Sequence, residues 1–232
     1  KVMKKIPLLI AVPTTAGTGS ETTIAAVISN PRTHEKYAVN DFHLVPKYAV
    51  LDPLITVGLP PHITATTGMD ALTHAVEAYV GRSNTEETRQ AARKAVKLIH
   101  ENLFTAFTDG SNLTARSNML TAAFYAGIAF TKAYVGYVHA IAHTLGGYYR
   151  IPHGLANAVI LPYVLEYYGE TAHQPLAELA DLIGITMQGE STAIKAGKFI
   201  GWIREMNTKM NIPTKLEGIE EKDLPGMIHN AL

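Results

Sequence analysis

Residues 68–77 read Gly-Met-Asp-Ala-Leu-Thr-His-Ala-Val-Glu, and this stretch indicates how the chain folds. It is rich in alanine and leucine, with no proline or glycine between Asp70 and His74, so it predicts a helix. Residues four apart lie on one face of a helix, so the two side chains project in the same direction. One carboxylate and one imidazole can then reach the same ion.

A second stretch, residues 138–154, adds three histidines in Val-His-Ala-Ile-Ala-His-Thr-Leu-Gly-Gly-Tyr-Tyr-Arg-Ile-Pro-His-Gly. His139 and His143 again stand four residues apart on a predicted helix. His153 follows two glycines and a proline, which we expect to end that helix at Leu145 and turn the chain back. By spacing alone, His139 and His143 are equivalent candidates for a ligand.

The two stretches together offer a carboxylate and several imidazoles without any thiolate. This combination favours Fe(II), Zn(II) or a similar ion over Ca(II) or Mg(II). Taken singly, a histidine in an apolar helix is more often a hydrogen-bonded packing residue, and Asp70 alone is typical of a helix start. Five such groups in two compact segments that are otherwise poor in charge favour a metal site.

The composition limits the classes of protein to consider. The 232 residues are 47% hydrophobic and 17% charged, which is enough for the core of a large domain. Twenty basic and twenty acidic side chains balance, so we expect neither nucleic acid nor a membrane as a partner. The chain has no cysteine and no apolar run near the roughly 20 residues of a membrane span. We therefore expect a cytoplasmic protein.

The character of the chain changes near residue 60. Before it, short runs with β propensity stand between Gly, Pro, Asn and Asp residues, at 8–12, 24–29, 37–40 and 48–51. After it, helical patterns dominate, at 60–79, 85–107, 113–133, 138–145, 154–168, 175–183, 191–210 and 222–232. The sequence therefore predicts a mainly α fold that is preceded by a short β-rich segment.

Residues 12–21 read Val-Pro-Thr-Thr-Ala-Gly-Thr-Gly-Ser-Glu and form the second informative segment. Its two glycines let the backbone approach a ligand closely, and its hydroxyls and amides can bind phosphate, ribose or amide groups. The Gly-Lys-Ser/Thr ending of a phosphate loop is missing, as is the Gly-x-Gly-x-x-Gly of a dinucleotide fold. These residues alone leave a ligand loop and a plain turn between strands equally open.

Taken together, the three segments resemble the iron-containing alcohol dehydrogenase family, the group that includes lactaldehyde reductase and propanediol dehydrogenase. The matching stretches are residues 13–21, residues 68–77, and the motif from His139 to His153 that continues Gly-Leu-Ala-Asn-Ala. They stand in the family's order and at about its spacing. The resemblance implies a metal-dependent, NAD(P)-linked alcohol dehydrogenase that works as an aldehyde reductase when the nicotinamide is reduced. Its implied metal is Fe(2+) or Zn(2+), its substrate a small alcohol or aldehyde, and its assembly a homo-oligomer, dimeric or larger.

The resemblance also implies the domain organisation. The complete protein would have a dehydroquinate synthase-like architecture, with residues 1–59 as the last part of an α/β dinucleotide-binding domain. Residues 60–232 would form the all-helical metal-binding catalytic domain. Family members carry a Rossmann-like region with a Gly-rich pyrophosphate loop before the segment that begins here, and they continue past Leu232. We therefore expect a fragment whose activity depends on the complete protein.

By the same resemblance, each matching position has a role. The implied metal ligands are Asp70, His74, His139 and His153. His143 is set apart from them, beside the nicotinamide, where it acts as the catalytic residue that moves the alcohol proton. The residues expected against the cofactor are Thr14, Thr15, Thr18, Lys36, Ile63 and His143. Phe130 and Val135 are expected in an apolar substrate wall.

Other functions use the same kind of ion. A metallohydrolase with a helical His-x-x-x-His needs a nearby glutamate base, but Ala140 and Ile141 stand in that place. A metal-binding fragment or interaction module without activity is the alternative from a different class. Within the superfamily, the alternative functions are those of a glycerol dehydrogenase, a hydroxyacid-oxoacid transhydrogenase or a maleylacetate reductase.

Overall fold

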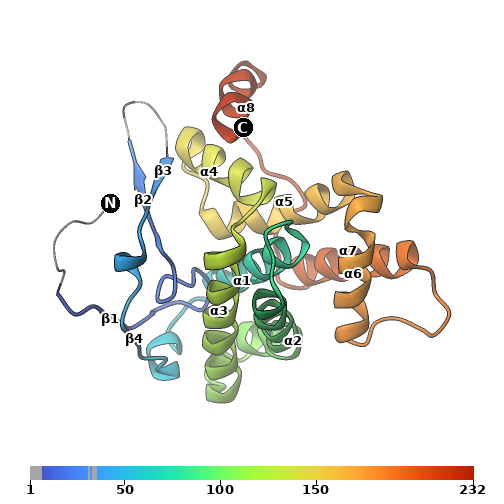
Figure 1. Ribbon diagram of the computed structural model, residues 1–232, viewed down its shortest axis with the longest axis horizontal. Helices are drawn as coiled ribbons and strands as arrows, with labels where there is room; N and C mark the ends of the chain where they lie inside the picture. The colour runs from blue at the N-terminus through green and yellow to red at the C-terminus, as the bar shows by residue number, and fades with distance from the viewer. Residues whose placement is uncertain (1–6, 31, 33–35) are drawn as a thin grey trace.

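Helices make up most of the protein, and a few short strands lie to one side of them (Figure 1). The computed structural model describes residues 7–30, 32 and 36–232. The strands are β1 (Ile10–Ala11), β2 (Ala25–Ser29), β3 (Lys36–Asn40) and β4 (Tyr48–Ala49). The helices are α1 (Pro61–Val80), α2 (Glu86–Thr108), α3 (Leu113–Ala133), α4 (Tyr137–Tyr149), α5 (His153–Tyr168), α6 (Glu170–Leu182), α7 (Thr192–Lys209) and α8 (Leu224–Ala231). Short 3-10 turns cover Phe42–Leu44, Pro53–Thr56 and Glu221–Asp223. The predicted mainly α class is confirmed.

α1 is the buried axis of the helical part. Pro60 and Pro61 favour its start, because a proline in the first turn loses no helical hydrogen bond. Almost every residue from Thr64 to Tyr79 is buried, since α2, α3, α5 and α6 all pack on this helix. A polar side chain on a helix that is buried on all sides must find its partners inside the protein.

The helical patterns predict most helices to within a few residues, but α4 differs. The two glycines after Leu145 do not end it, and it continues to Tyr149 before Arg150 adopts a left-handed conformation with φ 56°. Leu145 is buried in a small apolar cluster with Ala156 of α5 and Met227 of α8. This packing outweighs the cost of about 1 kcal/mol that each glycine imposes on a helix.

The start of α6 also differs from the prediction. The helix begins at Glu170, directly after Gly169, whose φ of 54° separates it from α5. Pro175, which was expected in the first turn, lies inside the helix. The end of the chain likewise forms a 3-10 turn before α8, so the last helix starts at Leu224 rather than at Lys222.

The strands form two separate pairs. β1 and β4 are parallel, with Ile10 opposite Tyr48, and β2 and β3 are antiparallel. Parallel strands are normally covered on both faces, but Ile10 and Tyr48 are each more than half exposed. The first helix begins at Pro61, beside the predicted boundary at residue 60, and the division into two domains stays a prediction. Among the described residues, no helix is long and apolar enough to cross a membrane.

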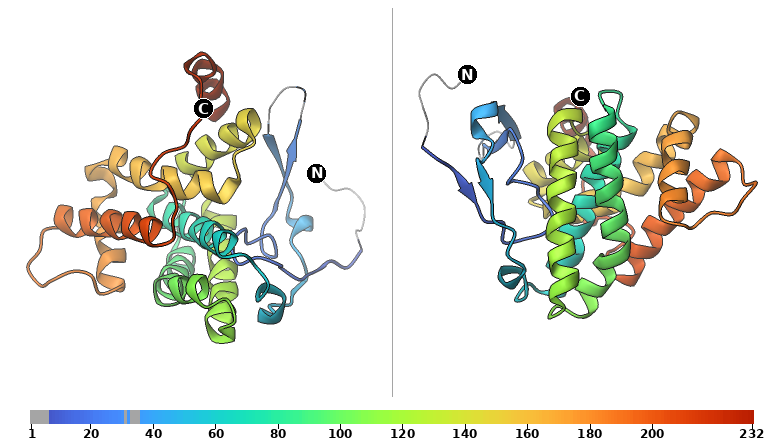
Figure 2. Two further views of the ribbon diagram at one scale, coloured as in Figure 1. Left: turned by 180° about the vertical axis from the view of Figure 1, so that it is seen from behind. Right: turned by 60° about the horizontal axis from the view of Figure 1, so that its bottom comes forward.

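A close backbone contact joins the strand side of the protein to the helices. The loop between β1 and β2 crosses to α3 (Figure 2), where Thr131 donates a hydrogen bond to the Thr22 carbonyl at 3.1 Å. A Cβ atom on Gly127 would lie 2.0 Å from Thr22 Oγ1 and 3.1 Å from the Gly19 Cα. Only glycine at position 127 therefore lets this loop rest on α3.

We expect Gly127→Ala to destabilise the protein by about 1–3 kcal/mol, because the added methyl group overpacks against the buried Thr22 hydroxyl group and the Gly19 backbone. Gly197→Ala in α7 is the matched control, since nothing lies within 4 Å of its added methyl group. There the change should stabilise by about 0.5–1 kcal/mol. The thermal unfolding midpoints of both variants test this, and equal midpoints would contradict the contact.

Candidate metal centre

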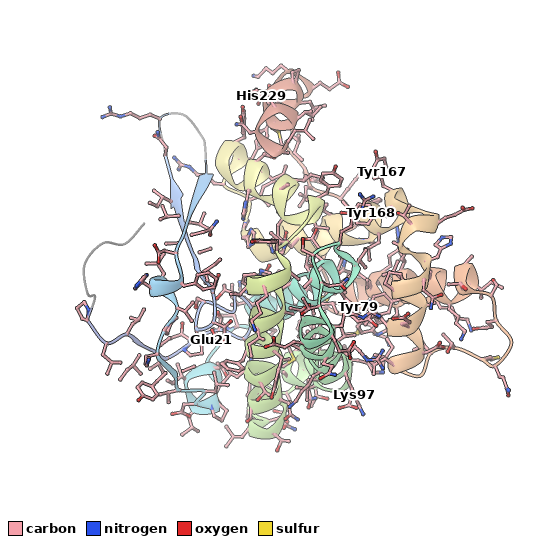
Figure 3. The ribbon with its side chains drawn as sticks, viewed as in Figure 1. Glu21, Tyr79, Lys97, Tyr167, Tyr168 and His229 are labelled. Carbon is pink, nitrogen blue, oxygen red and sulfur yellow. The ribbon has the colours of Figure 1, made fainter. Side chains whose placement is uncertain are left out.

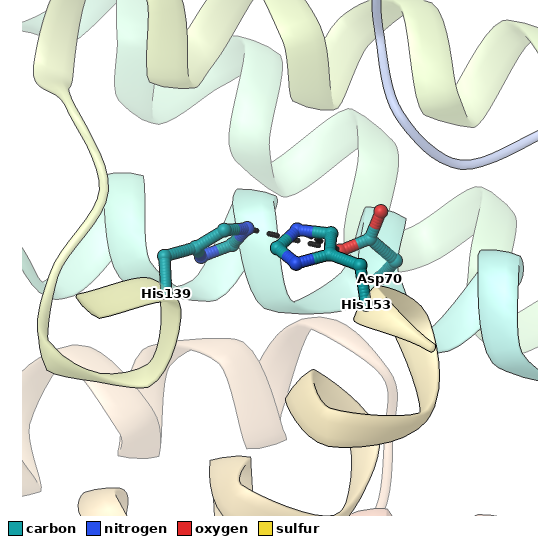
Figure 4. A group of neighbouring side chains, drawn as sticks. All are labelled: Asp70, His139 and His153. Atoms are coloured by element: carbon teal, nitrogen blue, oxygen red, sulfur yellow. Dashed lines mark ion pairs between the residues drawn. The ribbon is translucent and has the colours of Figure 1, made fainter. Parts of the chain in front are cut away.

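Three helices bring one carboxylate and two imidazoles to a common point. Asp70 comes from the middle of α1, His139 from the first turn of α4, and His153 begins α5. Asp70 Oδ1 lies 3.7 Å from His139 Nε2 and 3.6 Å from His153 Nε2 (Figure 4). One ligand atom from each residue falls within 4.8 Å of the other two. Among the described residues, this is the group whose spacing suits a metal ion.

Asn157, one turn after His153 on α5, points its amide nitrogen at the centre of this group. Nδ2 lies 2.6 Å from Asp70 Oδ1, 3.2 Å from His139 Nε2 and 3.1 Å from His153 Nε2. An amide has two hydrogens, so it cannot donate to three acceptors at once. Asn157 Oδ1 is buried and has no hydrogen bond in the described part of the chain. Three acceptors that converge in this way fit a divalent cation.

Glu77 fixes the orientation of His139. Its Oε2 accepts a hydrogen bond from His139 Nδ1 at 2.6 Å, and its Oε1 accepts one from the Val138 backbone N–H at 2.7 Å. Because Nδ1 carries the proton, the lone pair of His139 is on Nε2, which faces Asp70. A Cβ atom on Gly136 would lie 2.9 Å from Glu77 Oε1, so the small residue gives the carboxylate room. A carboxylate behind a histidine is the usual support of a metal-binding imidazole.

The surrounding groups keep Asp70 charged. Burial raises the pKa of Asp70, but the imidazoles of His74, His153 and His139 lower it. The Asn157 amide adds to this effect, and the pKa ends below its usual range. A deprotonated carboxylate that is 2% exposed needs positive partners.

His74 lies beside the cluster and is not one of its three convergent groups. Its ring stacks on His139 with centroids 4.4 Å apart and on Phe130 with centroids 4.3 Å apart. Burial lowers the pKa of His74 to about 3, an effect that His139 and His153 increase and that Asp70 and the Gly17 backbone oppose. The imidazole is therefore neutral at pH 7, the form that binds metal ions. The assignment of His74 as a fourth ligand stays a prediction.

The cluster opens into a cavity of about 530 Å³, a size typical of small-molecule sites. Besides the four predicted ligands, its lining includes His143, Thr18, Phe130 and Val135, all expected at a site from the sequence. His143 is half-buried and stacks on His153, with centroids 5.2 Å apart. The cavity also has lining residues that the sequence analysis did not predict at a site, namely Thr23, Ile24, Ala25, Val27, Asn40, Thr131 and Tyr134.

Other residues that were expected to bind the cofactor do not line this cavity. Thr14 and Thr15 lie further back in the same loop, and Ile63 lies in the first turn of α1. A Cβ atom on Gly17 would come within 2.6 Å of the Thr67 carbonyl, so the loop rests on α1 one turn after Ile63. Lys36 begins β3, and its side chain lies outside the described residues.

Glu21 closes the loop and lies between the strands and α3 (Figure 3). Its side chain is 3% exposed, and its burial raises the pKa of the carboxyl group. Glu21 Oε1 has no hydrogen-bond partner in the part of the chain that the structure describes.

Two residues of the site were missed by the sequence interpretation, although their positions carried a signal. Glu77 stands three residues after His74, and Asn157 stands four residues after His153. Each therefore shares a helix face with a predicted ligand. Polar residues that extend a ligand face by one turn are candidates for its hydrogen-bonding support.

Comparison with known proteins gives matches over nearly the whole chain. The pattern of the Fe-containing alcohol dehydrogenase family, C-terminal part, matches residues 64–232. The pattern of the iron-containing alcohol dehydrogenases matches residues 1–53.

Individual relatives agree with these patterns. The chain is 44% identical over 229 residues to 1,3-propanediol dehydrogenase from Klebsiella pneumoniae, and this alignment covers 98% of the chain and 59% of that protein. It is 38% identical over 232 residues to NAD-dependent methanol dehydrogenase from Bacillus methanolicus, covering 99% of this chain and 61% of that protein. A crystal structure of 1,3-propanediol oxidoreductase superimposes with a TM-score of 0.95 at 43% identity, covering 99% of this chain and 61% of that one. The chain thus spans about three fifths of the length of these relatives.

We expect Glu77→Gln to weaken divalent metal binding about 10- to 100-fold. The amide can still accept from Val138, but its NH₂ then faces His139 Nδ1. This favours the tautomer with the proton on Nε2, which cannot bind an ion. The dissociation constant of Zn²⁺, measured by competition with a chromophoric chelator, tests the effect.

Glu166→Gln is the matched control, because Glu166 pairs with Arg204 on an exposed surface. Its metal affinity should equal that of the wild type. If Glu77→Gln also binds Zn²⁺ as tightly as the wild type, Glu77 does not support the site.

Proposed function

The chain belongs to the iron-containing alcohol dehydrogenase family, and from this premise we propose that it is part of a metal-dependent, NAD(P)-linked alcohol dehydrogenase. The enzyme would reduce aldehydes when its nicotinamide is reduced. The observation that supports this most is the convergence of Asp70, His139 and His153 at the wall of a cavity that also holds His143 and Thr18. Because the chain spans 59% of the length of the Klebsiella pneumoniae 1,3-propanediol dehydrogenase, the proposed activity is that of the complete protein.

The donor set fits an iron or zinc ion held by Asp70, His139 and His153, with His74 as the fourth ligand. Such an ion, when bound, supplies a Lewis acid and a positive charge that stabilises negative charge on the substrate oxygen. Other residues of the chain orient the ligand side chains before the ion binds. Glu77 orients His139, so Nε2 of this ligand is positioned in advance. The Asn157 amide nitrogen lies where the three ligand atoms converge, and it would give up this place to the ion.

His143 is proposed to move the alcohol proton. It lines the cavity one turn after His139, and it is half-buried, so it can reach both the substrate and water. Imidazole exchanges protons readily near neutral pH. In the oxidation, the alcohol would give its hydroxyl proton to His143, and NAD(P), when bound, would supply the acceptor of the hydride. Aldehyde reduction runs the same two transfers in reverse.

The loop of residues 13–21 is proposed to hold the nicotinamide end of the cofactor. Thr18 reaches the cavity, while Thr14 and Thr15 come earlier in the same loop, before Gly17, which rests on α1 at Thr67. Hydroxyl and backbone amide groups of such a loop suit ribose and carboxamide. Phe130 and Val135 supply the apolar part of the cavity wall, which suits the carbon chain of a small alcohol. A related activity of the same superfamily, such as that of a glycerol dehydrogenase, would use the same site.

The proposal is tested on the complete protein, purified without oxygen and assayed with a panel of primary alcohols, diols and glycerol. With Fe²⁺ or Zn²⁺ added, we expect turnover of at least one small alcohol with NAD⁺ or NADP⁺. Removal of the ion with a chelator should abolish turnover, and added Fe²⁺ or Zn²⁺ should restore it. Turnover that persists in the metal-free protein would contradict the proposed metal dependence.

We expect His139→Ala and His143→Ala to differ in the metal that the purified protein retains. Loss of His139 leaves too few donors, so the protein should retain little metal by elemental analysis and show no turnover. His143→Ala should keep the metal but lose about 10²- to 10⁴-fold in kcat, the usual effect of removing a proton-transfer group. Metal loss from His143→Ala would mean that His143 is itself a ligand.

A further inference from the structure

Tyr134 has a backbone conformation that tyrosine rarely adopts. Its φ is 66° and its ψ is −180°, a region that is essentially restricted to glycine because a Cβ atom clashes there. Tyr134 directly follows α3, and its N–H donates a hydrogen bond to the Phe130 carbonyl at 2.7 Å. Outliers of this kind are held in place by their surroundings and gather at functional sites.

The other two non-glycine residues with positive φ in the described part of the chain are less unusual. Arg150 lies in the ordinary left-handed helical region, with φ 56° and ψ 27°. Asn211, with φ 59°, is of a residue type that often takes a left-handed conformation. Tyr134 combines a bulky side chain with a pair of backbone angles that is essentially restricted to glycine.

Packing within the chain does not explain why a tyrosine stands here. The side chain of Tyr134 is 62% exposed, so it does not fill the core. No hydrogen bond, ion pair or ring contact joins its side chain to the described residues. A glycine would satisfy the backbone without the clash, so the ring itself must serve a purpose.

The position of Tyr134 indicates this purpose. It lines the cavity that contains Asp70, His139 and His153, between Phe130 and Val135 in the sequence. Only residues 134–136 separate the end of α3 from the start of α4, and Glu77 holds Val138 at that start. The backbone is thus held on both sides of Tyr134, which keeps this residue at the cavity wall.

We propose that Tyr134 limits the size of the alcohol that the cavity admits, so that short, unbranched alcohols are preferred over bulky ones. This inference rests on the proposed alcohol dehydrogenase function. Phe130 stacks on His74, beside the convergent ligands, while Tyr134 lines the same cavity and is 62% exposed. An exposed lining residue lies at the mouth of a cavity, where the chain of a longer alcohol would pass. An aromatic ring at the mouth discriminates by size, because a bulky substrate must displace it or lose contact with the ion.

The test uses the complete protein with added Fe²⁺ and compares kcat/KM for benzyl alcohol with that for 1-propanol. Tyr134→Ala removes the ring and keeps the clashing Cβ atom, while Tyr134→Gly removes both. Each should raise the ratio of kcat/KM values for benzyl alcohol over 1-propanol by about tenfold or more. Tyr134→Gly should also unfold at a higher temperature than Tyr134→Ala, because only glycine relieves the backbone.

Two controls separate size from other effects. Tyr134→Phe keeps the ring and loses the hydroxyl group, so its ratio should stay within about twofold of the wild type. Asn211→Gly relieves a positive φ away from the cavity and should leave the ratio unchanged.

An active wild type with an unchanged ratio in both Tyr134→Ala and Tyr134→Gly would overturn the role of Tyr134 alone. A Tyr134→Phe ratio that rises as far as that of Tyr134→Ala would overturn it too, since the hydroxyl group would then be the determinant. A complete protein that oxidises no alcohol would overturn the proposed function and this inference with it.

Discussion

The carboxylate of Asp70 is buried at the middle of the most enclosed helix, and the rest of the site depends on it. An isolated charge in such a place costs several kcal/mol unless positive or hydrogen-bonding groups surround it. Here two imidazoles face it at 3.6–3.7 Å and the Asn157 amide donates to it at 2.6 Å. Neutral imidazoles alone compensate only part of a negative charge, whereas a divalent cation compensates all of it. The cluster therefore suits a divalent cation.

The need to compensate the buried charge of Asp70 explains the arrangement of the helices around α1. His139 and His153 each lie at the start of a helix, and Glu77 of α1 holds the first turn of α4 through Val138 and His139. The loop of residues 13–21 reaches the same place because Gly127 lets it rest on α3. One cavity consequently joins the cluster, a proton-transfer candidate and the loop that suits a nucleotide. The chain spans about three fifths of the length of its relatives.

The sequence predicted much of this, within a limit set by distance along the chain. The alanine- and leucine-rich stretch was enough to predict α1, and the spacing of four residues placed Asp70 and His74 on one face, because that geometry is local. The family resemblance separated His139 from His143, which spacing alone did not. Glu77 and Asn157 share a helix face with a predicted ligand, but they were not predicted at the site. The partners that define their roles, His139 and Asp70, lie 62 and 87 residues away in the sequence. The continuation of α4 past two glycines depends on packing against α5 and α8, and the left-handed Tyr134 depends on the short turn between α3 and α4. Neither can be read from local propensity.

Asp70, His139 and His153 are expected to bind a divalent ion together. This expectation is tested most directly by a crystal structure of the complete protein loaded with Zn²⁺, with diffraction data collected on both sides of the zinc absorption edge. We expect an anomalous difference peak about 2.0–2.2 Å from an oxygen of Asp70 and from Nε2 of both histidines. A zinc peak elsewhere, or full occupancy of Zn²⁺ without contact to Asp70, would contradict it.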